Sequence, residues 1–117
     1  MLEEVNQSQL SEIAESVRPL ADRILRPHVS GTDKSHLRAL HDDLNRQRNR
    51  ERAKGFILKM FMRILAYQPD SSSEAVMRVV REIYASEPFR DMLCDVTKGI
   101  ILDTCPEIKR ASRGFKR

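Results

Sequence analysis

A run of ten residues, from Asn45 to Lys54, holds the side chains whose types and spacing could do chemistry. It contains five cations, one carboxylate and no apolar side chain larger than alanine, and strongly apolar segments lie on both sides of it. Burying several unpaired guanidinium groups would cost several kcal/mol each. The run is therefore expected to be a solvated face, or a surface that contacts a negatively charged partner.

On a helix the cations of this region fall into two stripes. The first covers about 60° of the circumference and consists of Arg48, Arg52, Lys59 and Arg63. The second lies on the side that a core would use and consists of Arg46, Arg50 and Lys54. Together they predict positive charge nearly all round the middle of the helix, as in a segment that a polyanion wraps. Arginine suits such a role because its planar group makes bidentate phosphate contacts and stacks on bases.

The segment from Arg46 to Ala53, with the pattern Arg-x-Arg-x-Arg-Glu-Arg-Ala, resembles the arginine-rich RNA-binding motifs of viral and phage regulators. The resemblance implies a short helix that contacts RNA, and it covers only these residues; no family is identified for the whole chain. Basic residues of the C-terminal tail are expected to assist. The candidate nucleic-acid-binding residues are Arg46, Arg48, Arg50, Arg52, Lys54, Lys59, Arg63, Lys109, Arg110 and Arg113.

The sequence lacks the motifs of the common catalytic and metal sites. It has no glycine-rich phosphate loop, no Gly-x-Ser-x-Gly elbow and no His-Glu-x-x-His. His36 and His41 lie about 140° apart round a helix, and the neighbours Asp42 and Asp43 about 100° apart, so neither pair converges on one metal or one reacting atom. We therefore expect no enzyme, no metal and no cofactor.

The two cysteines are not expected to bridge each other. Cys94 and Cys105 are eleven residues apart, which is about 16 Å along a helix and beyond the reach of a disulfide. Cys94 is expected in the core and Cys105 at an exposed helix end. Two free thiols fit a reducing compartment.

Composition and charge describe one helix-rich domain. Of 117 residues, 32% are charged and 40% hydrophobic, with four glycines and no tryptophan. Residues 31–68 hold nine cations against four anions and residues 105–117 five against one, whereas the other two blocks are mildly acidic. The positive charge is thus concentrated in the middle and in the tail, unlike a uniformly basic coat.

No segment reads as a membrane span or a secretory signal. The most apolar stretch, residues 56–62, is interrupted by Lys59 and falls far short of the roughly 20 uncharged residues that span a bilayer. The first six residues are acidic, where a secretory signal would begin with basic residues. We expect an intracellular protein, cytoplasmic or, in a eukaryote, nuclear.

Hydrophobic periodicity predicts helices along most of the chain. Apolar residues at three- and four-residue steps between Leu10 and Ile24 predict a first helix, with a kink or a second start at Pro19. Residues 26–32 read as a linker because of Pro27 and Gly31. A second helix of about 33 residues is expected to begin near Thr32–Ser35 and to run through the arginines, with a break near Gly55 as the alternative.

Two further helices follow a turn at residues 68–73. Ser71 and Glu74 have capping-box spacing, and Val76, Val79, Val80 and Ile83 share one face. Pro88 suits a first turn, and the next helix carries its buried stripe on Phe89, Met92, Leu93, Val96 and Ile100. A short last helix is expected to end near Ser112.

The expected fold is an all-α bundle of four to five helices with a long central helix. It covers residues 1–112 as a single domain, and residues 113–117 form a flexible basic tail. Because the apolar ends of so long a helix exceed what one small core covers, a homodimer is expected.

The expected function is that of a non-enzymatic regulatory or accessory protein that binds nucleic acid, RNA more than duplex DNA. The alternatives are a solvated charged connector, and a helical adaptor or assembly subunit whose arginines pair with an acidic protein. Salt dependence separates these readings, because phosphate contacts weaken steeply with ionic strength and apolar docking does not.

Overall fold

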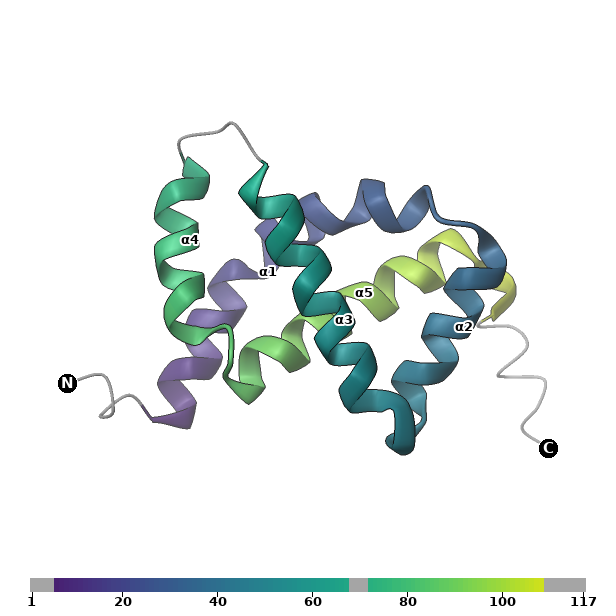
Figure 1. The fold of residues 1–117 in the computed structure, drawn as a ribbon, viewed down its shortest axis with the longest axis horizontal. Helices are drawn as coiled ribbons and strands as arrows, with labels where there is room; N and C mark the ends of the chain where they lie inside the picture. The colour runs from purple at the N-terminus through teal and green to yellow at the C-terminus, as the bar shows by residue number, and fades with distance from the viewer. Residues whose placement is uncertain (1–5, 68–71, 109–117) are drawn as a thin grey trace.

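The computed structural model describes residues 6–67 and 72–108, and every regular element in these ranges is an α-helix. Figure 1 shows how the helices cross one another in a body whose extents are 51 × 31 × 20 Å. The helices are α1 (Gln7–Ser30), α2 (Lys34–Asn45), α3 (Gln47–Ala66), α4 (Ser72–Ile83) and α5 (Glu87–Thr104). The predicted all-α class is confirmed. Among the described helices, none combines the length and the low charge that crossing a bilayer requires.

The first helix, α1, is longer than the sequence predicts. It begins at a capping box. The Asn6 side chain accepts from the Gln9 N–H at 2.9 Å, and the Gln9 side chain accepts from the Asn6 N–H at 3.0 Å. It then continues through Pro19 and Pro27 to a C-cap at Gly31. The linker expected from residue 26 is wrong for residues 26–30. Leu25 and Val29 are fully buried there, and their burial offsets the hydrogen bond that Pro27 cannot make.

The long helix expected through the arginines is wrong, because the chain breaks at Arg46. This residue has extended backbone angles (φ −100°, ψ 120°) and separates α2 from α3. Neither helix is broken at Gly55, which lies inside α3. Asn49 bridges the break by donating from Nδ2 to Asp43 Oδ1 at 3.0 Å, and Asn45 Nδ2 donates to the His41 carbonyl at 2.9 Å. The two helices therefore fold back against each other as a hairpin (Figure 1).

The helix at the centre of the molecule is α5, which contacts α1, α2 and α3. Pro88 lies in its first turn, as the sequence predicts, and the structure adds a cap at Ser86, whose side chain accepts from the Phe89 N–H at 3.4 Å. All five residues of its predicted stripe are buried, and Phe89 meets Phe61 of α3 edge to face at 5.9 Å. The core is thus organised around α5 and not around the arginine-rich segment.

The shorter helix α4 covers one end of the bundle. Val80 and Ile83 are buried, whereas Val76 is half-buried and Val79 is 41% exposed. The predicted capping box at Ser71 lies outside the described residues. The apolar face of α4 is therefore only partly used by the core.

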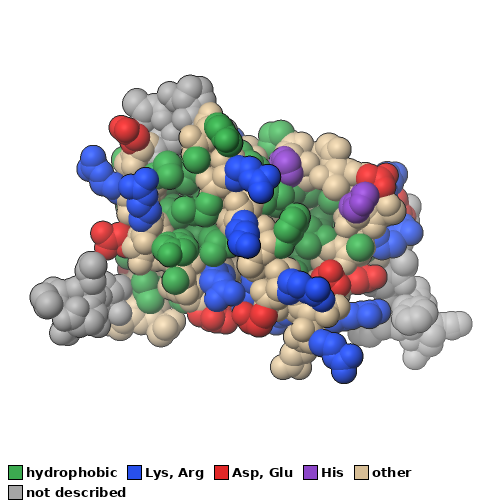
Figure 2. Space-filling model, viewed as in Figure 1, with side chains coloured by type: hydrophobic (Ala, Val, Ile, Leu, Met, Phe, Trp, Pro, Cys, Tyr) green, Lys and Arg blue, Asp and Glu red, His purple; other side chains and the backbone are tan. Residues whose placement is uncertain are grey.

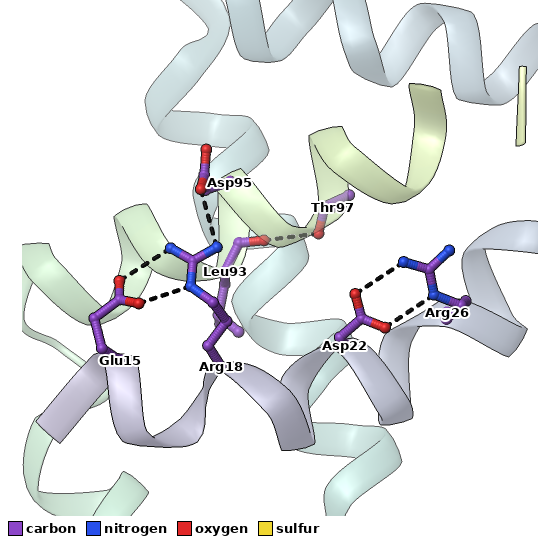
Figure 3. Close-up of polar contacts among 7 residues, drawn as sticks. All are labelled: Glu15, Arg18, Asp22, Arg26, Leu93, Asp95 and Thr97. Atoms are coloured by element: carbon purple, nitrogen blue, oxygen red, sulfur yellow. Dashed lines mark hydrogen bonds and ion pairs between the residues drawn. The ribbon is translucent and has the colours of Figure 1, made fainter. Parts of the chain in front are cut away.

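Ion pairs clamp α1 onto α5. Arg18 contacts Glu15 of its own helix at 2.8 Å and Asp95 of α5 at 3.0 Å (Figure 3). Arg26 repeats the arrangement, with Asp22 at 2.9 Å and Asp103 of α5 at 3.2 Å. The hydrogen bond from Arg26 lowers the pKa of Asp22 below its ordinary value. Asp95 and Asp103 of α5 are therefore already paired with arginines of α1.

The two cysteines are both buried, so the expectation that Cys105 is exposed is wrong. Cys94 is 4% and Cys105 1% exposed, and both are free thiols. Burial raises the pKa of the Cys94 thiol to about 11. After a one-residue interruption at Cys105 the chain continues as helix through residues 106–108, and Cys105 belongs to the buried core cluster.

The expectations for the C-terminus and for self-association are not tested. The end of the last helix near Ser112 and the tail at residues 113–117 lie outside the described residues. The homodimer stays a prediction, although the continuous helix from which it was inferred is absent.

Candidate nucleic-acid interface

The solvent face of α3 carries a row of exposed residues that we call the α3 stripe. It consists of Arg48, Arg52, Phe56, Lys59 and Arg63. At about 100° per residue, these five positions cover about 80° of the helix surface. Figure 2 shows Lys and Arg side chains following α3 from the upper middle to the lower right of the view. The sequence thus predicted the four cations of this stripe in one row, and the structure brings them to one surface.

The four cations of the α3 stripe have no carboxylate partner among the described residues. Every salt bridge in this part of the chain involves other cations: Arg18, Arg26, Lys34, His36, Lys54 and Arg90. Even Glu51, inside the arginine run, contacts Arg90 at 3.3 Å and Lys54 at 3.5 Å instead. None of the described carboxylates therefore compensates the charge of the stripe.

Lys54 does not belong to this surface, which corrects its assignment as a nucleic-acid-binding residue. Its side chain is 4% exposed, and Nζ lies 2.7 Å from Asp91, 3.1 Å from Glu87 and 3.5 Å from Glu51. The hydrogen bond to Asp91 raises the pKa of Lys54 above its ordinary value. Lys54 is thus a cation that ties α3 to the start of α5.

The other two residues of the second predicted stripe have different surroundings. Arg50 is exposed, but it lines a shallow hollow together with four carboxylates, so its surroundings are negatively charged. The carboxylates are Glu15, Glu87, Asp91 and Asp95. Arg46 is exposed at the junction of α2 and α3. The sequence predicted positive charge nearly all round the helix. In the structure the positive charge is instead concentrated on one side. Lys109, Arg110 and Arg113 lie outside the described residues.

A cleft of about 560 Å³ lies directly beside the α3 stripe. Its walls come from the end of α1, from α2 and from α3. Its lining residues are His28, Val29, Thr32, His36, Leu37, Ala39, Leu40, Asp43, Arg52, Ala53, Phe56 and Met60. In Figure 2 hydrophobic and histidine side chains appear next to the cations of α3, on the side of α2. Arg52 and Phe56 belong to both the stripe and the cleft.

Phe56 is the residue of this surface that sequence reasoning missed. From the sequence it had no role beyond membership of the most apolar stretch, residues 56–62, yet it is 58% exposed, the second most exposed large hydrophobic residue described. Its position four residues after Arg52 and three before Lys59 places it in the cationic row, which is a signal that the helical spacing contained. An exposed aromatic ring among cations is the combination found in single-strand binding surfaces.

No metal centre is formed by the described residues, in which no three His, Cys, Asp or Glu side chains are grouped to hold an ion. Comparison of the chain with protein-family models, curated proteins and solved structures found no match in any of the three. The functional conclusion rests on the surface itself.

Proposed function

We propose that this protein binds single-stranded nucleic acid, RNA more than duplex DNA, through the α3 stripe, and that it acts without catalysing a reaction. The observation that carries the proposal is the row of four cations that have no described carboxylate partner and that flank an exposed phenylalanine on one helix face. The stripe extends over fifteen residue steps, about 22 Å of helix. Such a track can contact several consecutive phosphates.

The physical basis is the release of counterions from the nucleic acid. Each cation that neutralises a phosphate of a single strand contributes about −0.7 to the slope of log affinity against log salt concentration. Four contacts predict a slope near −3, which weakens binding about 50-fold between 50 and 200 mM salt. Stacking on Phe56 would add affinity that salt does not remove.

The experiment is fluorescence anisotropy with a labelled single-stranded RNA, the same sequence as single-stranded DNA, and a DNA duplex, each at several salt concentrations. The test variant replaces Arg48, Arg52, Lys59 and Arg63 by glutamine. Because these side chains are exposed, circular dichroism should show an unchanged fold. We expect the variant to lose nearly all binding and nearly all of the salt dependence.

A charge-matched control separates the stripe from net charge. It replaces four other exposed cations, Arg23, Arg38, Arg78 and Arg81, by glutamine, which removes the same charge elsewhere. If both variants lose affinity equally, binding reflects net charge and the α3 stripe is not the site. If the wild type binds none of the three nucleic acids at low salt, nucleic-acid binding itself is refuted.

A second candidate is an interaction module, favoured by a groove at the other end of the molecule. This groove, about 830 Å³, lies between α1 and α4. Its lining combines apolar residues with two arginines and one glutamate: Leu10, Ile13, Val79, Ile83, Arg78, Arg81 and Glu82. Val79 and Tyr84 are exposed on α4. A partner helix with apolar residues and acidic flanks would complement it.

Measuring self-association tests both the dimer that the sequence predicts and the role of this groove. Sedimentation velocity of the wild type over a hundredfold concentration range would reveal a dimer. We expect Val79→Glu to weaken a dimer that uses the groove, whereas the glutamine variant of the α3 stripe should leave it intact. A wild type that remains monomeric throughout would contradict the predicted dimer.

A further inference from the structure

We infer that the cleft between α1, α2 and α3 takes one unstacked base of a bound single strand, while the α3 stripe holds the phosphates on either side of it. This inference rests on the proposed function and identifies the ligand more narrowly. It makes the site specific for single strands, because a base paired and stacked in a duplex cannot enter a cleft without being flipped out.

The geometry that carries the inference is the shared wall of cleft and stripe. Arg52 and Phe56 line the cleft and also belong to the cationic row. Measured from Arg48, Phe56, Met60 and Ala53 lie about 80°, 120° and 140° round the helix, so the cleft opens beside the stripe on the side of α2. A strand whose phosphates follow the stripe therefore has its bases directed at the opening of the cleft or at solvent.

The lining of the cleft suits a flat, largely apolar group with polar edges. Val29, Leu37, Leu40 and Met60 supply apolar walls. His36, Thr32 and Asp43 contribute polar groups to the lining. Phe56 and Arg52 form the wall that the cleft shares with the α3 stripe. The volume of about 560 Å³ lies within the roughly 300–1,000 Å³ of small-molecule pockets.

The charge around the cleft selects for a ligand that carries phosphate. Arg52 is exposed and forms no salt bridge with a described carboxylate, so its guanidinium group can pair with a phosphate or stack on a base. Asp43 also lines the cleft, where its carboxylate accepts a hydrogen bond from Asn49 Nδ2 of α3 at 3.0 Å and forms no salt bridge with a described cation. A neutral apolar ligand would form no ion pair with the cations of the α3 stripe beside the cleft.

The first test compares a single-stranded oligonucleotide with an abasic oligomer of the same length and phosphate count. The two probes have the same backbone charge and differ only in their bases. Stacking and burial of a base predict that the abasic oligomer binds about 5- to 150-fold more weakly. Equal affinity, still lost in the glutamine variant of the α3 stripe, would overturn the cleft assignment and leave the proposed function standing. Loss of binding to both probes at low salt would overturn both.

A variant that fills the cleft tests its location. Ala39 lines the cleft from α2 and is exposed, so Ala39→Trp adds volume there without disturbing the core. We expect this variant to bind the oligonucleotide as weakly as the wild type binds the abasic oligomer, and to bind the abasic oligomer normally. The matched control is Ala75→Trp, at an exposed position of α4, which should bind both probes like the wild type. Normal oligonucleotide binding by Ala39→Trp would overturn the assignment.

Methionine methyl signals give a readout that does not depend on affinity for a long strand. Met60 lines the cleft, whereas Met77 lies on α4 and Met92 is buried in α5. In a 13C-methyl-methionine sample, a nucleoside 5′-monophosphate should shift the Met60 signal and leave those of Met77 and Met92 unchanged. Ribose 5-phosphate at the same concentration should shift none of them. A Met60 signal that responds equally to both compounds, or to neither at millimolar concentration, would overturn the inference.

Discussion

The two faces of α3 carry the same residue types in opposite surroundings. On the core face, Phe61 is fully buried and Lys54 is 4% exposed. On the solvent face, Phe56 is 58% exposed and Lys59 is exposed as well. Within one helix, then, a phenylalanine can build the core or border a cleft, and a lysine can join two helices or remain open to a ligand.

The difference teaches that position round the helix, and not residue type, decides the role of each cation in the arginine-rich run. Lys54 lies three residues before Ile57 and seven before Phe61, so it shares their face. Arg48 and Arg52 lie on the opposite side, in line with Lys59. A count of positive charges along the sequence combines these two groups, which the fold separates.

The two phenylalanines give the largest expected contrast in stability. Phe61→Ala should lower the free energy of unfolding by about 3–5 kcal/mol, because it removes a fully buried ring that packs on Phe89. Phe56→Ala should change it by less than about 0.5 kcal/mol. Urea unfolding followed by circular dichroism measures both. A large loss of stability in Phe56→Ala would mean that this ring belongs to the core and is not available to a ligand.

The two lysines give the next contrast. Lys54→Ala should destabilise by about 2 kcal/mol, because it removes a buried aliphatic stem and an ion pair between α3 and α5, while the three carboxylates can still be solvated. Lys59→Ala should cost less than about 0.5 kcal/mol but weaken oligonucleotide binding. Equal effects of the two changes on stability would contradict the separation of the two faces.

The pH dependence of the Lys54 effect has a definite sign. Because the pKa of Lys54 is raised in the folded protein, its stabilisation is fully present below about pH 10 and is lost as the pH rises through the folded-state pKa. The difference in stability between wild type and Lys54→Met should therefore be constant from pH 6 to pH 9 and shrink toward pH 11. A constant difference up to pH 11 would show that packing, and not charge, accounts for the effect.

Asn49→Ala tests what fixes the start of α3, and hence which residues share a face. It should cost about 1 kcal/mol, because it removes the hydrogen bond to Asp43 that bridges the break between α2 and α3. Helical content by circular dichroism should stay the same. An increase in helical content would indicate that α2 and α3 have joined into the continuous helix that the sequence predicted.

The exposed ion pairs of α1 provide the smallest effect. Asp22 is half exposed and its interaction with Arg26 is screened by water, so Asp22→Asn should destabilise less than Lys54→Ala does. Because the pKa of Asp22 is lowered, its contribution is present above about pH 4 and is lost as the pH falls through the folded-state pKa. The stabilities of wild type and Asp22→Asn should thus converge as the pH falls below about 4. A difference that persists there would assign the effect to something other than charge.

The elements that local signals define were predictable from the sequence. For α5, the proline at position 88 and a regular apolar stripe both indicated the same helix. For α3, the spacing of Arg48, Arg52, Lys59 and Arg63 was enough to place them on one face. These features depend only on neighbours within a few turns.

The features that were missed depend on packing between distant segments. Pro27 indicated a linker, but burial of Leu25 and Val29 against the rest of the core keeps the helix intact there. The break at Arg46 has no proline or glycine to announce it. Its local signals are Asn45 and Asn49, whose side chains donate hydrogen bonds to the C-terminal part of α2. The burial of Lys54 requires the carboxylates of α5, which are more than thirty residues away in sequence.

The two buried thiols make the central helix a natural reporter of opening events. With a pKa of about 11, only about one Cys94 side chain in ten thousand is a thiolate at pH 7, and its sulfur is also shielded from reagents. Reaction of Cys94 or Cys105 with a thiol reagent must therefore wait until α5 separates from its neighbours. The labelling rates of the two cysteines, followed by mass spectrometry, would measure how often the core around Cys94 and the core around Cys105 open to water.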